Sequence, residues 1–520
     1  MSKKKKIIIG GVLLSLIAVV IVMTTSTKKT DKFPEIDLQI AKKGDLINEQ
    51  GTSENKYYKE YPKEIKTTFT TIVVPENRND QNSRLISLPV KILHSLSENP
   101  KEPVFRLTGG PGSSNIKRAP DLWLLEDHDI VMVGYRGIDG SVILKTPEIP
   151  KSLVGEGDPL SLENLKNIAE RSTEGFNRLK ASGIDVDSYT TIDVVDDLED
   201  ARKEVLGYEK INTISYSYGT RLAYYYGLRY PENVNRSVLE GVNPPGHFVW
   251  KSQDNEDILS KIAAEWQKDP LCLERSPDIL ATIRNVQNTF PYTWRGIEII
   301  ESKVKLMMFM MSYNQNGIVQ VLDAFIAAEN GDYSGLAFLN MAYDQLPDMH
   351  GMVWGENVSK ALSADFDPDH DYLSDDPEDA LMGAEFSKIF AMKTYGGWPI
   401  KLIPEEYRKL QYSEVETLLI SGDIDVSTPC QNATNMLKYL PNGEQVIFEN
   451  RGHQDAGNFQ PKEYRKLIMD FYSTGVVDGS QIKNVPIKFH DAKPSFQKMG
   501  KMFRFIKRLG LTNFVSKFMN

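Results

Sequence analysis

The 520-residue chain contains only two cysteines, Cys272 and Cys430. So few thiols exclude a disulfide framework and a zinc site built from several cysteines. A single bridge between the two stays open from sequence, and two separate buried thiols are the favoured interpretation. The sequence has no internal repeat, and no motif in it implies a metal or an organic cofactor.

Acidic residues are missing from both ends of the chain. Residues 1–30 hold six lysines and residues 492–520 hold seven lysines or arginines, without an Asp or Glu in either range. The rest of the chain carries 48 basic against 71 acidic side chains. An acidic body argues against nucleic-acid binding, whereas basic ends suit an anionic membrane surface.

The N-terminus has the pattern of a membrane anchor. Residues 1–6 carry four lysines, and residues 7–24 contain no charged side chain. An uncharged apolar run of about 17–20 residues can span a bilayer, so residues 7–24 are predicted to be a transmembrane signal anchor. No Ala-x-Ala-like cleavage site follows, so an anchor is favoured over the alternative, a protein secreted after signal-peptide cleavage. The positive-inside rule keeps residues 1–6 cytoplasmic and places the body outside the cytoplasm.

Strand-like runs alternate with helical spacing in the body of the chain. This alternation predicts an α/β fold with a mostly parallel sheet and helices on both faces. Residues 25–61 are polar and are predicted to be a linker. The core is expected in two parts, residues 62–244 and 411–475. Between them, residues 245–410 show helical patterns without a convincing strand, which predicts a large inserted helical cap.

Residues 476–520 form a basic tail with an amphipathic end. Met499, Met502 and Phe503 recur at helical spacing, with lysines and arginines between them. A helix lying on a membrane surface and a helix docked on the protein's own body both fit this pattern.

A candidate nucleophile stands between a β-prone run, residues 211–216, and a helical run, residues 222–228. Ser215, Ser217 and Gly219 form a Ser-x-Ser-x-Gly motif there. Such a turn presents a serine hydroxyl at the end of a strand, and small residues two places to either side let the backbones approach closely. The alternative is an ordinary strand–turn–helix with a serine in it by chance.

A serine hydroxyl needs a base to remove its proton, and the base needs a partner that fixes its tautomer. Downstream of Ser217 an acid and a histidine follow in the expected chain order. Asp425 comes after a predicted strand at residues 414–420, and His453 after one at 445–448. Asp423 competes with Asp425, which is favoured because it reaches farther past the strand end. The alternative is a histidine in a surface loop and two aspartates that cap loops.

The reaction also needs two backbone N–H donors for the oxyanion. One is expected from Tyr218, directly after the nucleophile. The other is expected from the glycine loop after an early strand, at Gly110 or its neighbour Gly109.

Four loops of the chain resemble those of the proline iminopeptidase and tripeptidyl aminopeptidase family of serine peptidases. Residues 108–113, Thr-Gly-Gly-Pro-Gly-Ser, resemble its His-Gly-Gly-Pro-Gly oxyanion motif, and residues 136–141 resemble its Asp-x-Arg-Gly-x-Gly-x-Ser loop. Residues 422–429 resemble the loop with its catalytic acid, and residues 452–453 the loop with its histidine. The resemblance covers residues 60–475. It implies an α/β-hydrolase fold and a triad of serine, aspartate and histidine.

The chain departs from that family's pattern at four positions. Thr108 replaces its His, Ser215 replaces the first elbow Gly, Gly134 stands in place of the Asp of the arginine loop, and Asp139 in place of a Gly. None removes a group that takes part in covalent chemistry, so the departures bear on the substrate more than on the mechanism.

The resemblance also implies acids that hold the free ammonium group of a substrate. Glu240 after a core strand, and Glu356 and Asp365 in the cap, are the candidates; the alternative for each is a solvated surface acid. Asp365 begins an alternating run of aspartates like that of a calcium loop. His370 occupies the glycine position of such a loop, so a solvated acidic loop is favoured.

Together these features predict a serine hydrolase, and within that class an aminopeptidase that takes a peptide with a free N-terminus. The predicted roles are Ser217 as nucleophile, His453 as base, Asp425 as orienting acid, and Tyr218 with Gly110 as oxyanion donors. One alternative is an esterase or lipase with the same triad. The other is a non-catalytic binding protein with the same fold.

Overall fold

The computed structural model describes residues 31–345, 351–490 and 495–508. The predicted cytoplasmic segment and signal anchor, residues 1–24, therefore lie outside the described residues. Within the described ranges, no helix combines the length and the apolar character that crossing a bilayer requires.

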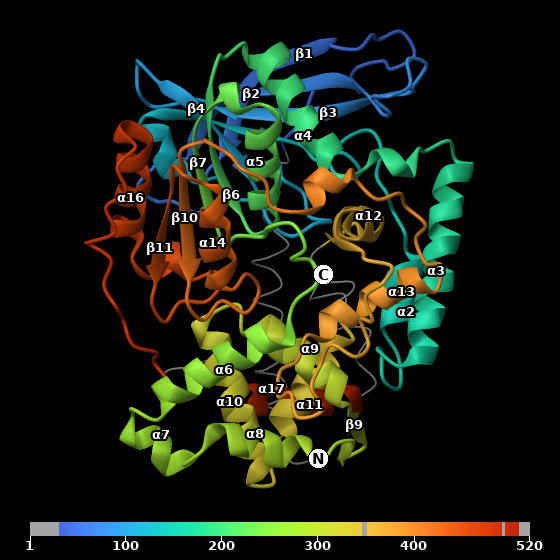
Figure 1. The fold of residues 1–520 in the computed structure, drawn as a ribbon, viewed down its shortest axis with the longest axis vertical. Coiled ribbons are helices and arrows are strands. Elements are labelled where there is room, and N and C mark those ends of the chain that lie inside the picture. The colour runs from blue at the N-terminus through green and yellow to red at the C-terminus, as the bar shows by residue number, and fades with distance from the viewer. Residues whose placement is uncertain (1–30, 346–350, 491–494, 509–520) are drawn as a thin grey trace, which may run out of the picture.

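One nine-stranded sheet carries the fold (Figure 1), in the order β1-β2-β3-β5-β4-β6-β7-β10-β11. The strands are β1 (Leu46–Glu54), β2 (Glu64–Pro75), β3 (Leu85–Leu93), β4 (Lys101–Leu107), β5 (His128–Val133), β6 (Ile211–Tyr216), β7 (Val234–Glu240), β10 (Thr417–Gly422) and β11 (Gly443–Phe448). The six strands from β5 to β11 in this order pair in parallel, and β1, β2 and β3 add an antiparallel edge. The predicted mostly parallel sheet is confirmed.

The first strand corrects the predicted linker. Residues 46–54, inside the range 25–61 assigned to a linker, pair with β2 from Leu46 opposite Ile72 to Glu54 opposite Glu64. Only one residue of this edge strand is buried. Since the strand covers no core, it has no alternation of apolar and polar residues for the sequence to reveal.

Helices cover both faces of the sheet. The core helices are α2 (Glu148–Leu153), α3 (Leu162–Ala181), α4 (Thr191–Asp200), α5 (Tyr218–Arg229), α14 (Cys430–Met436), α15 (Ala456–Phe459) and α16 (Pro461–Thr474). Alternate strand residues point to opposite faces. Val104 of β4 belongs to the apolar cluster that includes α16, whereas Phe105 belongs to the cluster that includes α4 and α5.

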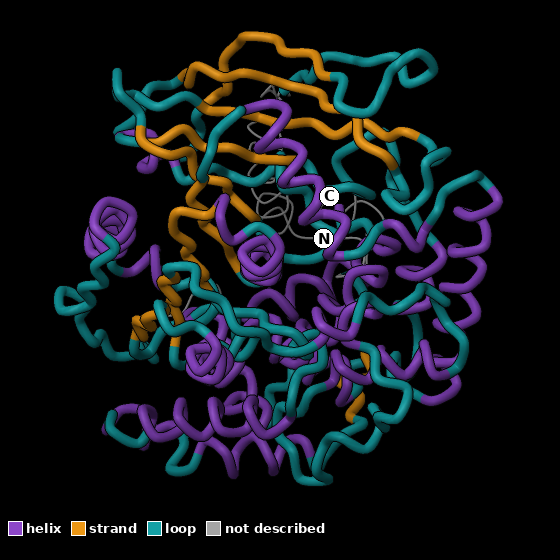
Figure 2. The backbone as a smooth tube through the Cα atoms, turned by 45° about the horizontal axis from the view of Figure 1, so that its top comes forward, coloured by secondary structure: helices purple, strands orange, loops and turns teal. Residues whose placement is uncertain are grey.

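The cap is inserted between β7 and β10, as predicted, and lies beyond one end of the sheet (Figures 1 and 2). Its helices are α6 (Ser252–Trp266), α7 (Pro270–Arg275), α8 (Ile279–Gln287), α9 (Glu301–Met311), α10 (Gln315–Glu329), α11 (Ser334–Tyr343), α12 (Trp354–Asp365) and α13 (Ala391–Thr394). It also contains a hairpin of β8 (Tyr292–Trp294) and β9 (Ile297–Ile299). The sequence predicted no strand here, because three residues are too few to show a period.

The tail helix α17 (Phe496–Arg508) docks on the cap. Its Phe496 and Phe503 rings lie 5.2 and 5.7 Å from that of Phe338 on α11. A Cβ on Gly500 would lie 1.8 Å from the Ser334 carbonyl oxygen, so the two helices cross closely. Over residues 496–508, the tail is therefore a helix docked on the protein's own body, which is one of the two predicted alternatives.

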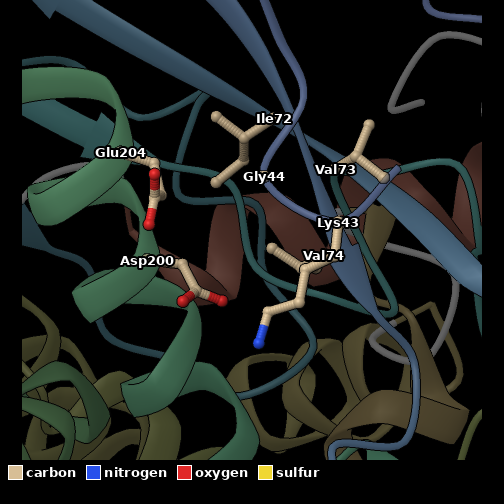
Figure 3. A pocket seen from close by; sticks show the side chains of 7 residues that line it. All are labelled: Lys43, Gly44, Ile72, Val73, Val74, Asp200 and Glu204. Carbon is tan, nitrogen blue, oxygen red and sulfur yellow. The ribbon is translucent and has the colours of Figure 1, made fainter. Parts of the chain in front are cut away.

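A small recess lies between β2 and the π-helical turn η3 (Ala201–Leu206) (Figure 3). It is lined by Lys43, Gly44, Ile72, Val73, Val74, Asp200 and Glu204. None of the residues predicted for the site is among them, so the candidate site is elsewhere.

Candidate active site

Ser217 occupies the sharp turn between β6 and α5. Its φ and ψ are 52° and −122°, a conformation that side-chain-bearing residues rarely adopt. The turn is held from the next strand, because the Ser217 N–H donates to the Glu240 carbonyl of β7 at 2.9 Å. This geometry is that of a nucleophile elbow.

The residues on either side of Ser217 explain the motif. A Cβ on Gly219 would lie 2.2 Å from the Leu107 carbonyl oxygen, so the helix can approach β4 only with glycine there. Ser215 tolerates its extra hydroxyl because that group donates to the Val238 carbonyl at 2.8 Å. The departure from glycine at position 215 therefore leaves no buried polar group without a partner.

Asp425 and His453 meet at the ends of the neighbouring strands β10 and β11. The His453 Nδ1 lies 2.8 Å from the Asp425 Oδ2. The Asp425 Oδ1 accepts from the N–H groups of Ser427 and Thr428, both at 2.8 Å, and the Thr428 hydroxyl donates to Oδ2 at 2.6 Å. The carboxylate is thus fixed on three sides, with one oxygen directed at the imidazole.

Asp423, the competing acid, points away from the imidazole. Its Oδ2 pairs with the Lys261 ammonium at 2.5 Å, and its Oδ1 accepts from the Asn450 N–H. The structure therefore separates the two acids: Asp425 contacts the histidine, and Asp423 ties the strand end to the cap.

The imidazole lies next to the elbow. A Cβ on Gly241 would be 3.0 Å from the His453 Cε1 and 3.2 Å from its Nδ1, and Gly241 directly follows the residue whose carbonyl holds Ser217. On its other side, the ring of Tyr313 from the cap packs at 5.1 Å. The three predicted residues are therefore brought to one edge of the sheet.

The glycine loop after β4 packs against the nucleophile. A Cβ on Gly109 would lie 2.6 Å from the Ser217 Cβ, and Gly110 has a φ of 76° that favours glycine. Within the described residues, the N–H groups of Gly110 and Tyr218 donate to no protein acceptor. Two free donors beside the hydroxyl are what an oxyanion site requires.

Buried side chains hold this loop in place. Asn115 accepts from the Thr108 N–H at 3.0 Å and donates to the carbonyls of Arg106 and Val133, so it joins the loop to β4 and β5. The Asp139 carboxylate accepts from the Asn115 and Tyr135 N–H groups, both at 3.0 Å.

The same contacts explain two of the departures from the peptidase pattern. A Cβ on Gly134 would lie 2.7 Å from the Asp139 Cβ, so Asp139 occupies the space next to Gly134. In this chain, a side chain larger than glycine at position 134 would collide with Asp139.

A model of the α/β hydrolase fold family matches residues 102–456, more than half of the chain. The chain belongs to the α/β hydrolase fold family. The sheet order, the elbow and the inserted cap described above are in accord with this assignment.

Tripeptidyl aminopeptidases from Streptomyces lividans and Streptomyces coelicolor are each 26% identical to this α/β hydrolase over 227 residues. That alignment covers 41% of this chain and 38% of each relative, so the chain matches well under half of their length. Solved structures with the fold include the hydrolase MGS-M2 from a Medee basin deep-sea metagenome library (TM-score 0.35, 14% identity, 76% of this chain and 96% of that one). Serine hydrolase CCSP0084 from Cycloclasticus zankles is similar at a TM-score of 0.35 and 12% identity, over 83% of this chain and 100% of that one. Likeness at this level carries no information on substrate.

Two of the three acids proposed for substrate binding in this α/β hydrolase are enclosed by protein. Asp365 makes a two-point ion pair with Arg221 of the elbow helix, at 2.8 and 2.9 Å, and neither side chain has exposed area. Its oxygens also accept from the N–H groups of Gly246 and Phe248. Asp365 therefore fastens the cap to the elbow helix and is corrected from a substrate ligand to a structural one.

Glu356 is equally enclosed, with 0% of its side chain exposed. Its Oε2 accepts from the Gly112 N–H in the glycine loop. Burial raises the pKa of this carboxyl, although the Lys360 ammonium 3.5 Å away favours the charged form. Its position corrects the second expectation: Glu356 supports the oxyanion loop from the cap.

Glu240, the third acid, lies at the catalytic edge. It is part-buried at the end of β7, and the Tyr464 hydroxyl donates to its Oε2. Burial raises the pKa of Glu240 to about 7, against the lowering effects of that hydroxyl and of the nearby His453. Its other oxygen, Oε1, accepts no hydrogen bond from the described residues. The Glu356 Oε1 also lacks a hydrogen-bond partner among these residues, but it is fully buried and lies 3.5 Å from the Lys360 ammonium.

Sequence reasoning missed several supporting residues. Thr428 and Asn115 hold the acid and the glycine loop, and Tyr313 packs on the histidine. Thr428 had a signal, since it lies within the Gly-x-x-Asp-x-x-Thr-Pro loop. The other two act across long sequence distances, and no local pattern marks them.

Proposed function

We propose that this α/β hydrolase is a serine hydrolase that cleaves peptides near a free N-terminus. The Ser217 oxygen attacks the scissile carbonyl carbon while His453 takes the hydroxyl proton. The imidazolium then gives this proton to the leaving amine, and the acyl group remains on Ser217. Water attacks the ester through the same histidine and releases the acid. Gly110 and Tyr218 donate to the oxyanion in both halves.

The single observation that carries this proposal is the contact of the Asp425 carboxylate with the His453 Nδ1 at 2.8 Å. It commits Nδ1 to the acid and leaves Nε2 to exchange the proton with Ser217. Burial disfavours the imidazolium and lowers the pKa of His453. The negative charges of Asp425 and, to a smaller extent, Glu240 favour the imidazolium and outweigh burial, so the pKa of His453 is raised above its ordinary value. The acid thus stabilises the charge that forms on the base during attack.

Two observations favour a peptidase over an esterase. The aligned relatives are aminopeptidases. In addition, Glu240 has a carboxyl oxygen near His453 to which no group of the described residues donates. An ionised carboxylate in such part-desolvated surroundings attracts a cation such as a peptide ammonium group.

A fluorophosphonate probe tests the nucleophile. We expect it to label the wild-type chain and not a Ser217→Ala variant. Absence of labelling in both would favour a non-catalytic binding protein, and equal labelling in both would remove Ser217 from its role. Comparing turnover of aminoacyl arylamides with that of short acyl esters then tests the substrate class, since turnover of esters alone would favour the esterase or lipase alternative.

We also propose that residues 7–24 anchor the enzyme with its catalytic body outside the cytoplasm. The proposal rests on the sequence pattern of residues 1–24. The mass of the mature N-terminus tests it, because a product that begins near residues 24–32 would instead indicate a secreted, cleaved protein.

A further inference from the structure

A group of metal-ligating side chains lies in the cap, away from the triad. Asp269 and Cys272 stand at the start of α7, and His490 comes from the segment that leads to α17. One ligand atom from each residue lies within 4.8 Å of the ligand atoms of the other two. The described part of the chain contains no second group of three or more His, Cys, Asp or Glu side chains arranged in this way.

Packing holds the three residues together. The ring of Phe489 lies 5.1 Å from that of Trp266, which is fully buried at the end of α6, and this contact brings His490 to α7. The Asp269 Oδ1 caps α7 by accepting from the Leu271 N–H at 2.9 Å, which leaves Oδ2 directed at the imidazole. Cys272 has 0% exposed area, so its thiol faces this group and not solvent.

The contacts are those of a ligand set and not of a proton relay. Both partners face the same ring nitrogen: the His490 Nε2 is 2.7 Å from the Asp269 Oδ2 and 3.8 Å from the Cys272 Sγ. In a relay, the acid and the nucleophile must hold different ring nitrogens. Convergence of sulfur, nitrogen and oxygen on one point is instead the arrangement that surrounds a cation.

The donor set and its spacing fit zinc. Zn²⁺ takes thiolate, imidazole and carboxylate ligands in tetrahedral geometry, for which donor atoms are about 3.4–3.6 Å apart. The separations of 2.7 and 3.8 Å lie on either side of this range, so shifts of less than about 1 Å would seat the ion. Water would complete the fourth position.

We propose that Asp269, Cys272 and His490 bind Zn²⁺ and fasten the C-terminal segment to the cap. Binding releases the thiol proton to solvent and forms the Zn–S bond. The ion would join Cys272 to His490, which are 218 positions apart in sequence. His490 lies shortly before α17, the helix that docks on α11. A site with one cysteine agrees with the exclusion of sites built from several, and the separation of its ligands hides it from motif searches.

Titration of the metal-free full-length chain with Co²⁺ tests the site, because Co²⁺ bound to a thiolate gives a charge-transfer absorption. We expect one equivalent to bind with this absorption and Zn²⁺ to displace it. Cys272→Ser should abolish the absorption, and His490→Ala should weaken binding at least about 100-fold, since even the loss of an outer-shell partner costs about 10–100-fold.

Two matched controls come from the same chain. Cys430→Ser removes the other free thiol. His370→Ala removes a histidine that contacts Asp375 at 2.7 Å, a His–Asp pair without cysteine. Neither should change Co²⁺ binding. Absence of the thiolate absorption in the wild-type chain, its persistence in Cys272→Ser, or its loss in Cys430→Ser would overturn the proposal. If Cys272→Ser fails to fold, the exposed His490→Ala variant decides through the same titration.

Discussion

Glu240→Gln removes a charge from the catalytic edge and keeps the shape of the side chain. The amide oxygen can still accept from the Tyr464 hydroxyl, so the substitution isolates ionisation from packing. Because the folded state raises the pKa of this carboxyl, the free energy of unfolding must depend on pH through Glu240.

The sign and size of the effect follow from the pKa. Burial raises it from 4.5 to about 7. Between these values the folded state keeps a proton that the unfolded state releases. The stability linked to Glu240 is therefore fully present below pH 4.5 and is lost as the pH rises through about 7. At about 1.4 kcal/mol per pH unit, and discounted for the side chain's remaining solvent contact, the loss is about 2–3 kcal/mol.

Urea unfolding of the wild type and Glu240→Gln at about pH 5 and about pH 8.5 measures this term. We expect the variant to gain about 2–3 kcal/mol relative to the wild type between the two conditions. Parallel pH dependences, within about 0.5 kcal/mol, would refute the assignment of a raised pKa to Glu240.

The same variant tests the proposed contact with the substrate. If the ionised Glu240 holds the ammonium group, Glu240→Gln should raise the KM for free aminoacyl substrates about tenfold or more, which corresponds to about 1.4 kcal/mol. The KM for N-acetylated analogues should not change. An equal effect on both substrates would assign Glu240 to the general structure of the site.

Three further test substitutions, two of them with a control variant, address the site and its supports. Asp425→Asn should lower kcat about 10⁴-fold by favouring the wrong tautomer of His453, whereas Asp423→Asn should leave kcat within about tenfold of the wild-type value. If steady-state kinetics showed the larger loss for Asp423→Asn, the roles of the two acids would be exchanged. Asp365→Ala should lower the free energy of unfolding by about 3–5 kcal/mol, because it leaves the Arg221 charge buried and unpaired. Glu405→Ala, in an exposed pair with Lys409, should leave the free energy of unfolding unchanged in the same denaturation assay. Gly109→Ala should lower kcat about 100-fold, since the new methyl group would displace the nucleophile, and an unchanged rate would contradict the loop position.

The location of the candidate site was predictable because each of its three main residues follows a strand that local patterns identify. Carboxyl ends of parallel strands meet at one edge of the sheet, so Ser217, Asp425 and His453 needed only their strand assignments and their chain order to be placed. The oxyanion loop followed from the glycines after β4 for the same reason.

The acids of the cap could not be assigned in this way. From sequence, Glu356 and Asp365 look like surface residues of a polar helix. Their true partners, the Gly112 N–H and the Arg221 guanidinium, lie 244 and 144 positions away. Such contacts depend on how the cap helices pack against the core, and no local sequence pattern predicts that packing. The edge strand β1 escaped detection because an exposed strand carries no periodic apolar signal.

Hydrogen bonds from the start of α12 tie the cap to the glycine loop beside Ser217. The Gly112 carbonyl accepts from the Val353 N–H at 2.8 Å, the Pro111 carbonyl accepts from the Asn357 amide at 2.9 Å, and Glu356 takes the Gly112 N–H. A chimera that exchanges this cap for that of another hydrolase would therefore have to reproduce three anchoring bonds before specificity could be engineered. A substitution in α12 that breaks these hydrogen bonds would therefore also shift the loop that packs against Ser217.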